Sequence, residues 1–364
     1  MSEPRPEEAI PTRKADHIRF AASAEAEPKS GAKWADITLL PRALPTADLD
    51  QVELYAEFLG HGLKAPLVIS SMTGGFEAAR EINAILAAAA ERHGIAMGVG
   101  SQRAALRNPA LAATFSVARE RAPTAMLIAN IGAPQLVPQE SGPAVSGDDI
   151  DRLARMIQAD ALAVHFNYLQ EAVQPEGDRR AHGLREAIAT ALANLELPAI
   201  AKETGAGLSE TAALEMRGLG FKALDVGGQG GTSFALIEGL RAQASGDARG
   251  SHLGSVFGDW GIPTPVSVVM ARAADLPIIA TGGIRSGLDA AKAIALGATL
   301  VGVARPLLLA ALQGSDAVDH WLYEFLEELR LAIFLTGGKS PRDLREARYV
   351  VLGDTRAWLT QLGH

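Results

Sequence analysis

The feature that most constrains the fold is a regular alternation, from Pro66 onward, of short apolar runs with longer amphipathic stretches rich in alanine. Short apolar runs predict buried strands and amphipathic stretches predict helices, so the alternation indicates repeated strand–helix units and a parallel sheet. The predicted strands number about eight, as a (β/α)8 barrel requires. They are Pro66–Ser70, Ile95–Val99, Ala125–Ala129, Ala161–Val164, Ala199–Ala201, Ala223–Val226, Ile278–Ala280 and Thr299–Val303. We therefore expect an α/β protein folded as one closed TIM barrel.

Helical patterns lie between these strands, and several end at a glycine. They are Ala78–Arg92, Pro109–Arg121, Asp148–Gln158, Leu184–Leu195, Ser209–Leu219 and Ser286–Leu296. The long stretch Phe234–Pro263 is rich in Gly, Ser and charge and is predicted as an insert and candidate lid. Val318–Leu335 predicts an extra C-terminal helix. Residues 1–30 show little apolar periodicity and are predicted to be a flexible segment, which leaves residues 31–364 as one barrel domain with the candidate lid at 234–263.

Composition narrows the function classes. The net charge of −8 argues against a broad nucleic-acid-binding face, so any phosphate site must be compact. The absence of cysteine excludes disulfides, a thiolate nucleophile, iron–sulfur clusters and thiolate zinc sites, and leaves oxygen and nitrogen ligands for any metal. The N-terminus lacks an apolar signal segment, and no apolar stretch approaches the roughly 20 residues that span a bilayer. We expect a cytoplasmic protein with no membrane or nucleic-acid partner.

Polar residues and glycines gather where the predicted strands end, which is the edge at which (β/α)8 barrels carry their active sites. The turns are Ser70–Gly75, Gly98–Arg103, Asn130–Ala133, His165–Asn167, Lys202–Gly205, Asp225–Ser233, Thr281–Arg285 and Gly302–Pro306. One such turn says little, because glycines also serve ordinary strand-to-helix turns. The full set indicates a ligand site at one rim of the barrel.

Three of these turns favour a phosphate-bearing ligand. Thr281–Ser286 and Gly302–Pro306 place glycine and arginine before a helix, where backbone N–H groups and the helix dipole face an anion. Gly227–Ser233 lets a large flat or phosphorylated ligand approach the backbone. Lys202, next to Glu203, fits a Schiff-base nucleophile, a structural ion pair or a cation that stabilises negative charge on a cofactor ring. Sequence position does not choose among the three.

The segment His165–Glu171 is unusually polar for the end of a buried strand. An imidazole, two amides and a carboxylate follow the apolar run Ala161–Val164. At this place in a barrel they can converge on a bound ligand. The segment is therefore a candidate for catalysis.

An ordered set of motifs extends over nearly the whole chain, from the basic cluster near the N-terminus to Arg305. The set is Arg13-Lys14 with His17, Ser71–Gly75, Gly100–Arg103, Asn130–Ala133, His165-x-Asn167-x-x-Gln170-Glu171, Lys202–Gly205, Gly230–Ser233 and Thr281–Arg285. With this set the chain resembles the type II isopentenyl diphosphate isomerases. The resemblance implies a flavin mononucleotide (FMN) enzyme of isoprenoid biosynthesis on a (β/α)8 barrel. It would interconvert isopentenyl and dimethylallyl diphosphate with reduced FMN, Mg²⁺ and NADPH as reductant, as a homotetramer or octamer.

The resemblance assigns the flavin to residues from several strand ends. The ring would contact Ser71, Met72, Thr73, Ser101 and Asn130. Lys202 would lie by the pyrimidine edge, where its charge favours the anionic reduced form. The ribityl and phosphate groups would be held by Thr232, Gly283, Ile284, Arg285, Ala304 and Arg305.

The resemblance also assigns the substrate and the metal. Arg13 and Lys14 would clamp the diphosphate, because a guanidinium fork and an ammonium group suit phosphate oxygens. Gln170 would lie against the allylic carbons. Glu171 would bind Mg²⁺, which takes one or two carboxylates together with waters and substrate phosphates. The further substrate-binding residues would be His17, Arg103, His165 and Asn167.

The implied reaction adds a proton to one carbon and removes one from its neighbour, with no net redox change. N5 of the reduced flavin is the implied acid, and Gln170 either relays the departing proton or only orients the substrate. The alternative function is an FMN-dependent 2-hydroxy acid oxidase on the same barrel, but that chemistry needs a histidine base that Gly227–Ser233 lacks. Phe166 and Tyr168 depart from the family's pattern, which puts the shape of the pocket in question rather than its chemistry.

Overall fold

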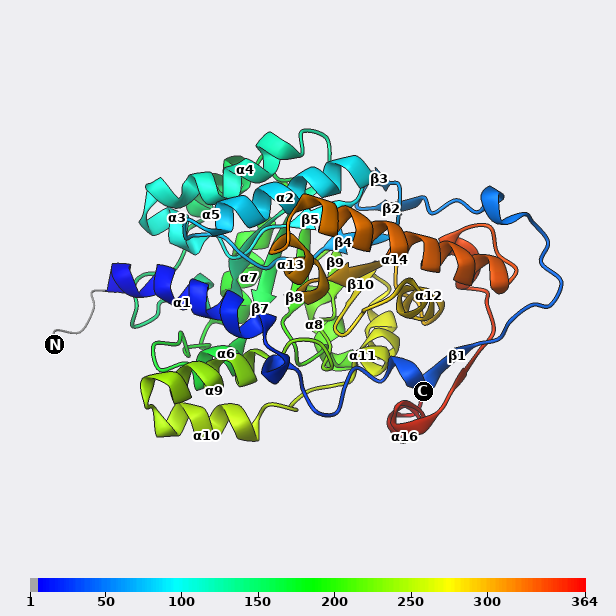
Figure 1. Ribbon diagram of the computed structural model, residues 1–364. Helices are drawn as coiled ribbons and strands as arrows, with labels where there is room; N and C mark the ends of the chain where they lie inside the picture. Colours follow the sequence, from blue (N-terminus) through cyan, green and yellow to red (C-terminus); the bar gives the residue numbers. More distant parts are fainter. Residues whose placement is uncertain (1–5) are drawn as a thin grey trace.

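The centre of the molecule is a closed barrel of parallel strands, in the order β10-β11-β4-β5-β6-β7-β8-β9 (Figure 1). The computed structural model describes the backbone of residues 6–364 and the side chains from residue 14 onward. The strands are β4 (Leu67–Ile69), β5 (Ala96–Gly98), β6 (Leu127–Gly132), β7 (Ala161–Phe166), β8 (Ala199–Glu203), β9 (Ala223–Asp225), β10 (Ile278–Thr281) and β11 (Leu300–Val303). Every predicted strand is present, so the (β/α)8 fold is confirmed.

Four strands run further than the sequence predicts, and β10 does so by one residue, to Thr281. β6 continues to Gly132, β7 to Phe166 and β8 to Glu203, because their ladders extend through the pairs Gly132 with His165 and Phe166 with Glu203. The polar residues at these ends therefore stand on regular strands. A strand fixes the direction of a side chain more tightly than a loop does, which suits a site that must hold its groups in place.

The barrel interior is packed at its lower level by small and medium apolar side chains. Val68, Ile128 and Ala163 are among the buried residues of this cluster. Just before β4, a hairpin of β2 (Ala56–Phe58) and β3 (His61–Leu63) inserts Phe58 and Leu63 into the same cluster. The hairpin closes the amino-terminal end of the barrel and leaves the carboxyl end for a ligand.

The outer helices confirm the predicted strand–helix alternation. They are α2 (Ala79–His93), α4 (Ala113–Arg121), α5 (Gly147–Met156), α7 (Leu184–Ala193), α8 (Glu210–Leu219), α11 (Thr264–Ala271), α12 (Gly287–Ala295) and α13 (Arg305–Ala311). The Ser209 and Ser286 side chains accept from backbone N–H groups of the first turns of α8 and α12, as good N-caps do. Gly220 ends α8 in the left-handed conformation that glycine adopts without strain.

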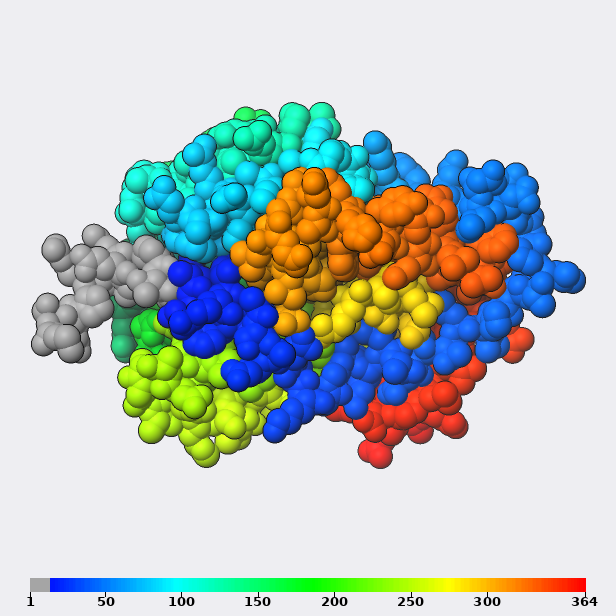
Figure 2. All heavy atoms as spheres, in the orientation of Figure 1, coloured from blue at the N-terminus to red at the C-terminus, as the bar shows by residue number. Residues whose placement is uncertain are grey.

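The predicted insert after β9 folds as two helices, α9 (Phe234–Ser245) and α10 (Ala248–Val256). They pack against each other, and α9 also packs against α6 (Tyr168–Val173) and against the N-terminal helix α1 (Pro6–Ala22). Figure 2 shows the part of α1 from Lys14 onward in blue, between the yellow-green α9–α10 pair and the cyan segment that carries α2. The roles of this insert as a lid and of residues 1–30 as a flexible segment stay predictions.

Two short strands, one from the N-terminal part of the chain and one from the C-terminal part, pair on the side of the barrel. β1 (Ile37–Leu39) pairs antiparallel with β12 (Tyr349–Val351), and α16 (Gly353–Leu362) follows. The predicted extra helix is α14 (Ser315–Leu335), which packs on α12 and α2. Within residues 6–364, no helix combines the length and the apolar character that crossing a membrane requires.

Candidate active site

A cavity of about 340 Å³ opens at the carboxyl end of the barrel, and it gathers the residues that the sequence singled out. Of the predicted site residues, those with described side chains all line it: Lys14, His17, Ser71, Met72, Thr73, Ser101, Arg103, Asn130, His165, Asn167, Gln170, Glu171, Lys202, Thr232, Gly283, Ile284, Arg285, Ala304 and Arg305. Arg13 belongs to α1, but its side chain lies outside the described residues. The grouping follows from the fold, since each residue follows or ends a strand, except for Lys14 and His17 on α1. Individual roles within the cavity stay predictions.

The floor of the cavity carries a row of polar side chains at one level of three adjacent strands. His165 on β7 pairs in register with Lys202 on β8, and Lys202 with Asp225 on β9. Lys202 Nζ lies 2.8 Å from Asp225 Oδ2. Of the three roles that the sequence allows for Lys202, the structural ion pair is therefore present. The ammonium group of Lys202 still lines the cavity.

His165 is a neutral imidazole in this environment. Burial, followed by the charges of Lys202 and Lys14, lowers the pKa of His165 from 6.5 to about 3. His165 Nδ1 lies 2.7 Å from Asn130 Oδ1, and because an amide oxygen only accepts, Nδ1 is the donor. His165 Nε2 is then the acceptor nitrogen.

Gln170 has both ends of its amide fixed. Its Oε1 accepts from Asn167 Nδ2 at 3.1 Å, and its Nε2 donates to Glu238 Oε1 at 3.0 Å. Glu238 Oε1 also lies 2.8 Å from His17 Nε2 on α1, and the other carboxylate oxygen pairs with Arg241. One buried carboxylate thus joins the candidate catalytic amide to the N-terminal helix.

The sequence did not predict Glu238, because residues 234–263 were interpreted as a candidate lid and no site residue was assigned within them. Burial alone would raise the pKa of Glu238, but the hydrogen bond and charge of His17 and the charge of Arg241 outweigh it and lower the pKa from 4.5 to about 2. The carboxylate is therefore ionised throughout the neutral range. The signal available in the sequence was an acidic residue shortly after the glycine-rich loop Gly227–Ser233.

We expect Glu238→Gln to destabilise the protein by about 3 kcal/mol near pH 7, because Arg241 loses its buried counter-ion. A lowered carboxyl pKa contributes stability above the unfolded-state value and loses it as the pH falls through the folded-state value. The difference in free energy of unfolding between the variant and the parent should therefore shrink as the pH falls from 4.5 towards about 2. Urea unfolding at a series of pH values measures it; a difference that stays constant with pH contradicts the assignment.

A second charged group surrounds Glu171 and Arg103. Arg103 pairs with Asp178, and its Nη2 donates to Ser141 Oγ at 2.6 Å. The backbone N–H of Asp178 donates to Glu171 Oε2 at 2.7 Å, so the two residues are in direct contact. Burial raises the pKa of Asp178, but the Ser141 hydrogen bond and the Arg103 charge outweigh it and lower that pKa. Asp178 was also missed, since it lies in the loop after α6, away from any strand end.

The part of the cavity where the phosphate is predicted to bind contains a carboxylate that the sequence did not predict. Glu27, from the segment after α1, pairs with Arg285 at 2.7 Å and also with Arg305. Arg305 further donates to the carbonyl oxygens of Ala21 and Ala22, at 2.8 and 3.1 Å. The two guanidinium groups therefore tie the end of α1 to the barrel, beside the glycine turns.

The cavity wall suits a flat, polar, phosphate-ended group. The buried hydroxyls Ser70 Oγ and Thr281 Oγ1 have no hydrogen-bond partner among the described residues. They lie over Gly302, where a Cβ would stand 2.0 Å from Thr281 Oγ1 and 2.6 Å from Ser70 Oγ. Because buried hydroxyls are normally paired, two orphans beside a glycine cradle indicate that a ligand completes them.

A divalent cation has few protein ligands in this cavity. Across the residues that the structure describes, no group of three or more His, Asp or Glu side chains could hold a metal ion. Mg²⁺ keeps several waters and often takes only one or two carboxylates, with substrate phosphates completing its shell. Glu171 as a single protein ligand is compatible with that behaviour.

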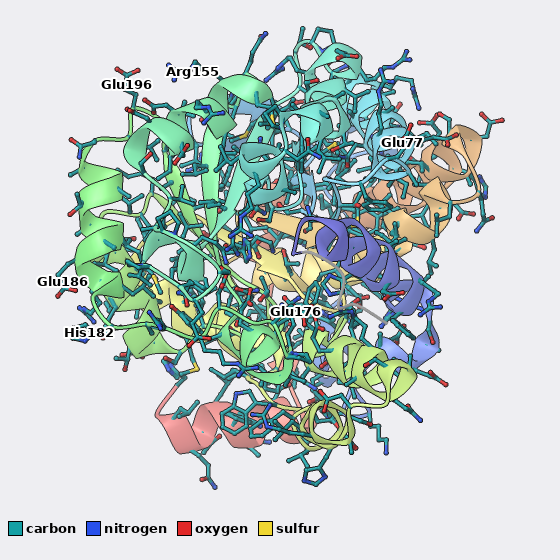
Figure 3. All side chains as sticks on the ribbon, turned by 90° about the vertical axis from the view of Figure 1, so that its left-hand side faces the viewer. Glu77, Arg155, Glu176, His182, Glu186 and Glu196 are labelled. Carbon is teal, nitrogen blue, oxygen red and sulfur yellow. The ribbon has the colours of Figure 1, made fainter. Side chains whose placement is uncertain are left out.

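The rim of the cavity faces the viewer in Figure 3, with Glu176 near the centre of the view. Arg241 links this rim residue to Glu238, with Arg241 Nη2 lying 3.2 Å from Glu176 Oε1. Glu186, Glu196 and Arg155 point outward at the edge of the same view. Helices α1, α6 and α9 border the cavity, since Lys14, Gln170 and Phe234 are among its lining residues.

Comparison with known proteins gives a consistent result. The family of FMN-dependent dehydrogenases matches residues 7–133 and 262–351. The isopentenyl-diphosphate delta-isomerase of Methanosarcina barkeri is 47% identical over 96% of this chain and 94% of its own. That of Methanoregula boonei is 48% identical over 95% of each chain.

Solved structures show the same barrel at much lower sequence similarity. A flavocytochrome b2 variant with sulfite bound has a TM-score of 0.64 and 16% identity, covering 90% of this chain and 81% of its own. A mandelate oxidase variant has a TM-score of 0.60 and 19% identity, covering 96% of this chain and 100% of its own. At this identity the likeness shows the fold and does not extend to the reaction.

Proposed function

Because the chain belongs to the FMN-dependent type II isopentenyl-diphosphate delta-isomerases, we propose that its cavity shifts the double bond between isopentenyl and dimethylallyl diphosphate with the residues described above. The observation that carries the residue roles is the convergence of Lys14, Gln170 and Glu171 on one cavity with the glycine turns. The alternative, a 2-hydroxy acid oxidase, is disfavoured because such oxidases are only distant structural neighbours.

FMN fits the cavity wall. The ring would lie against Met72, Thr73 and Ser101, with Lys202 at its polar edge and the orphan hydroxyls of Ser70 and Thr281 as further partners. The phosphate would meet the backbone of Gly283–Arg285 and Ala304, beside the guanidinium groups of Arg285 and Arg305. In its reduced form FMN would supply the acid of the double-bond shift, and NADPH is the proposed reductant.

The diphosphate would lie at the rim, where cationic groups converge. Lys14 Nζ already donates to the carbonyl oxygens of Gly74 and Ser101, so its ammonium group is held at the cavity edge. Arg103 faces the same space from its pair with Asp178. His165 can bind the diphosphate as a donor once the anion's charge offsets the burial that keeps it neutral. Arg13 remains a proposed partner of Lys14.

Gln170 is the proposed catalytic residue because its amide is held rigidly beside the substrate space. Asn167 and Glu238 together prevent the amide from rotating without the loss of two hydrogen bonds. A fixed amide can orient the allylic carbons and present one oxygen to the departing proton. The contact of His17 with Glu238 makes this arrangement depend on helix α1 as well.

Glu171 is the proposed Mg²⁺ ligand. Its side chain is buried, and its two oxygens accept from Asn167 Nδ2 at 3.1 Å and from the backbone N–H of Asp178 at 2.7 Å. The buried Asn167 Oδ1 has no hydrogen-bond partner among the described residues and could accept from a metal-bound water. These second contacts orient the carboxylate as outer partners of metal ligands do.

We expect Glu171→Gln to raise the Mg²⁺ concentration for half-maximal activity by at least about tenfold, because the substituted amide lacks the charge that attracts the cation. Glu186→Gln is the matched control, since Glu186 lies on α7 and points outward in Figure 3. Magnesium titration of the isomerase rate measures both. An unchanged titration in Glu171→Gln would remove Glu171 from the metal site.

The function itself is tested by anaerobic incubation with isopentenyl diphosphate, FMN, NADPH and Mg²⁺. Dimethylallyl diphosphate should form, and it should not form when FMN is left oxidised. No product under reducing conditions would refute the proposal.

Light scattering of the FMN-loaded protein tests the proposed homo-oligomer, a tetramer or octamer.

A further inference from the structure

Asp225 is buried beneath the cavity floor and touches no part of the proposed substrate space. It stands on β9 in register with Lys202 on β8, and the two side chains are 5% and 10% exposed. Lys202 lines the large cavity as well as a small cavity below it, whereas Asp225 lines only the lower one of these two. Lys202 therefore separates Asp225 from any ligand.

The contacts of Asp225 hold Lys202 in one place. Asp225 Oδ2 lies 2.8 Å from Lys202 Nζ, and Asp225 Oδ1 accepts from the backbone N–H of Gly227 at 3.3 Å. Gly227 begins the glycine-rich loop that the cavity shares. A lysine side chain is otherwise flexible, so this carboxylate fixes both the height of the ammonium group and its link to the loop.

The pair also sets how much positive charge the cavity floor presents. A single cation under a low-dielectric site acts strongly on a neighbouring charge, and a carboxylate 2.8 Å behind it offsets much of that effect. The neighbours on the same level are His165, which is neutral, and Gly132, which has no side chain. Asp225 is thus the group in this row that opposes the charge of Lys202.

We propose that Asp225 is a positioning residue that holds Lys202 at the flavin's polar edge and, by offsetting its charge, sets the reduction potential of bound FMN. The proposal rests on the placement of Lys202 beside the ring. Reduction of FMN takes two electrons and one proton to give an anion, so a floor with more positive charge favours the reduced form. Asp225 then limits how strongly the charge of Lys202 stabilises the anionic reduced FMN relative to the neutral oxidised FMN.

The test is the reduction potential of the FMN-loaded protein without substrate, measured by anaerobic titration with dithionite against a reference dye. Asp225→Asn removes the charge and keeps the size. It should shift the equilibrium towards reduced FMN at least tenfold, which is about 30 mV more positive for a two-electron couple. Asp225→Glu, which keeps the charge, should lie closer to the parent. Lys202→Met should shift the potential in the opposite direction.

The matched control is Asp160→Asn. Asp160 also pairs with a cation on the barrel, Arg119 at 3.0 Å, but neither of the two lines the cavity, so its removal should leave the potential unchanged. If Asp225→Asn does not load FMN, Asp225→Ser removes the same charge in less volume.

Each remaining outcome decides the matter. If Asp225→Asn changes the equilibrium between oxidised and reduced FMN by less than twofold while Lys202→Met shifts it, the role of Asp225 is overturned and that of Lys202 stands. No shift in either variant overturns the placement of Lys202. If neither charge-free variant folds while Asp225→Glu does, Asp225 is only a structural partner. Lack of isomerase activity in the parent would refute the proposed function and leave these potentials measurable.

Discussion

Replacing Gln170 by Asn is expected to lower the isomerase turnover by about 10²- to 10⁴-fold while FMN stays bound, in the range that a positioned proton-transfer group contributes. Asparagine is shorter by one methylene, so its amide withdraws from both Glu238 and Asn167, which now hold Gln170 at 3.0 and 3.1 Å. The residues proposed to contact the flavin, which follow β4 or lie on β8, are untouched. Loss of rate without loss of cofactor is therefore the expected signature.

The measurement is the anaerobic rate of product formation, with FMN stoichiometry read from absorbance on the same sample. Gln313→Asn, the same chemical change on a solvent-exposed turn after α13, should leave the rate unchanged. Turnover of Gln170→Asn within about threefold of the parent, with FMN bound, would exclude Gln170 from the mechanism.

Replacing Gly283 by Ala is expected to weaken FMN binding by about 10- to 100-fold, since each 1.4 kcal/mol is a factor of ten. Gly283 has a φ of +66°, a backbone conformation that residues other than glycine rarely adopt. A Cβ there would stand 2.2 Å from Ala32 Cβ and 2.6 Å from the carbonyl oxygen of Gly230. The turn must then move away from the glycine-rich loop, and the proposed phosphate position moves with it.

The control variant Gly220→Ala separates the effect of backbone strain from the effect of a steric clash. Gly220 also has positive φ, at +103°, but a Cβ there would have nothing within 4 Å. It ends α8 on the outside of the barrel, so its replacement should lower stability and leave FMN affinity intact. Fluorescence titration of FMN into the stripped protein measures both variants. Equal FMN affinity in Gly283→Ala and the parent would show that this turn does not form the phosphate site.

Periodicity predicted the barrel because its physical cause is local. Each strand is a short apolar run, and each helix has an apolar face with caps such as Ser209 or Gly220 at its ends. Once eight such units repeat, closure brings all the carboxyl ends to one rim. The sequence could therefore predict that His165, Lys202 and Gly283 share a cavity without any knowledge of the tertiary contacts between them.

The partners of these residues were beyond the reach of the sequence. His17 and Glu238 are 221 positions apart, and Arg305 and Glu27 are 278 positions apart. Asp225 is closer to Lys202 in sequence, at 23 positions, but only the register of β8 and β9 brings the two charges together. Nothing in composition or spacing assigns one carboxylate to one cation.

By itself the sequence determined the kind of molecule: a (β/α)8 barrel with glycine turns and polar residues at its rim, since these depend on local patterns that any such chain repeats. The tertiary structure decided which charges face each other. It placed Glu238 between Gln170 and α1, Asp178 beside Arg103, and Asp225 beneath Lys202. The physical reason is that pairing of buried charges depends on distances of a few ångströms, which packing fixes and sequence order does not.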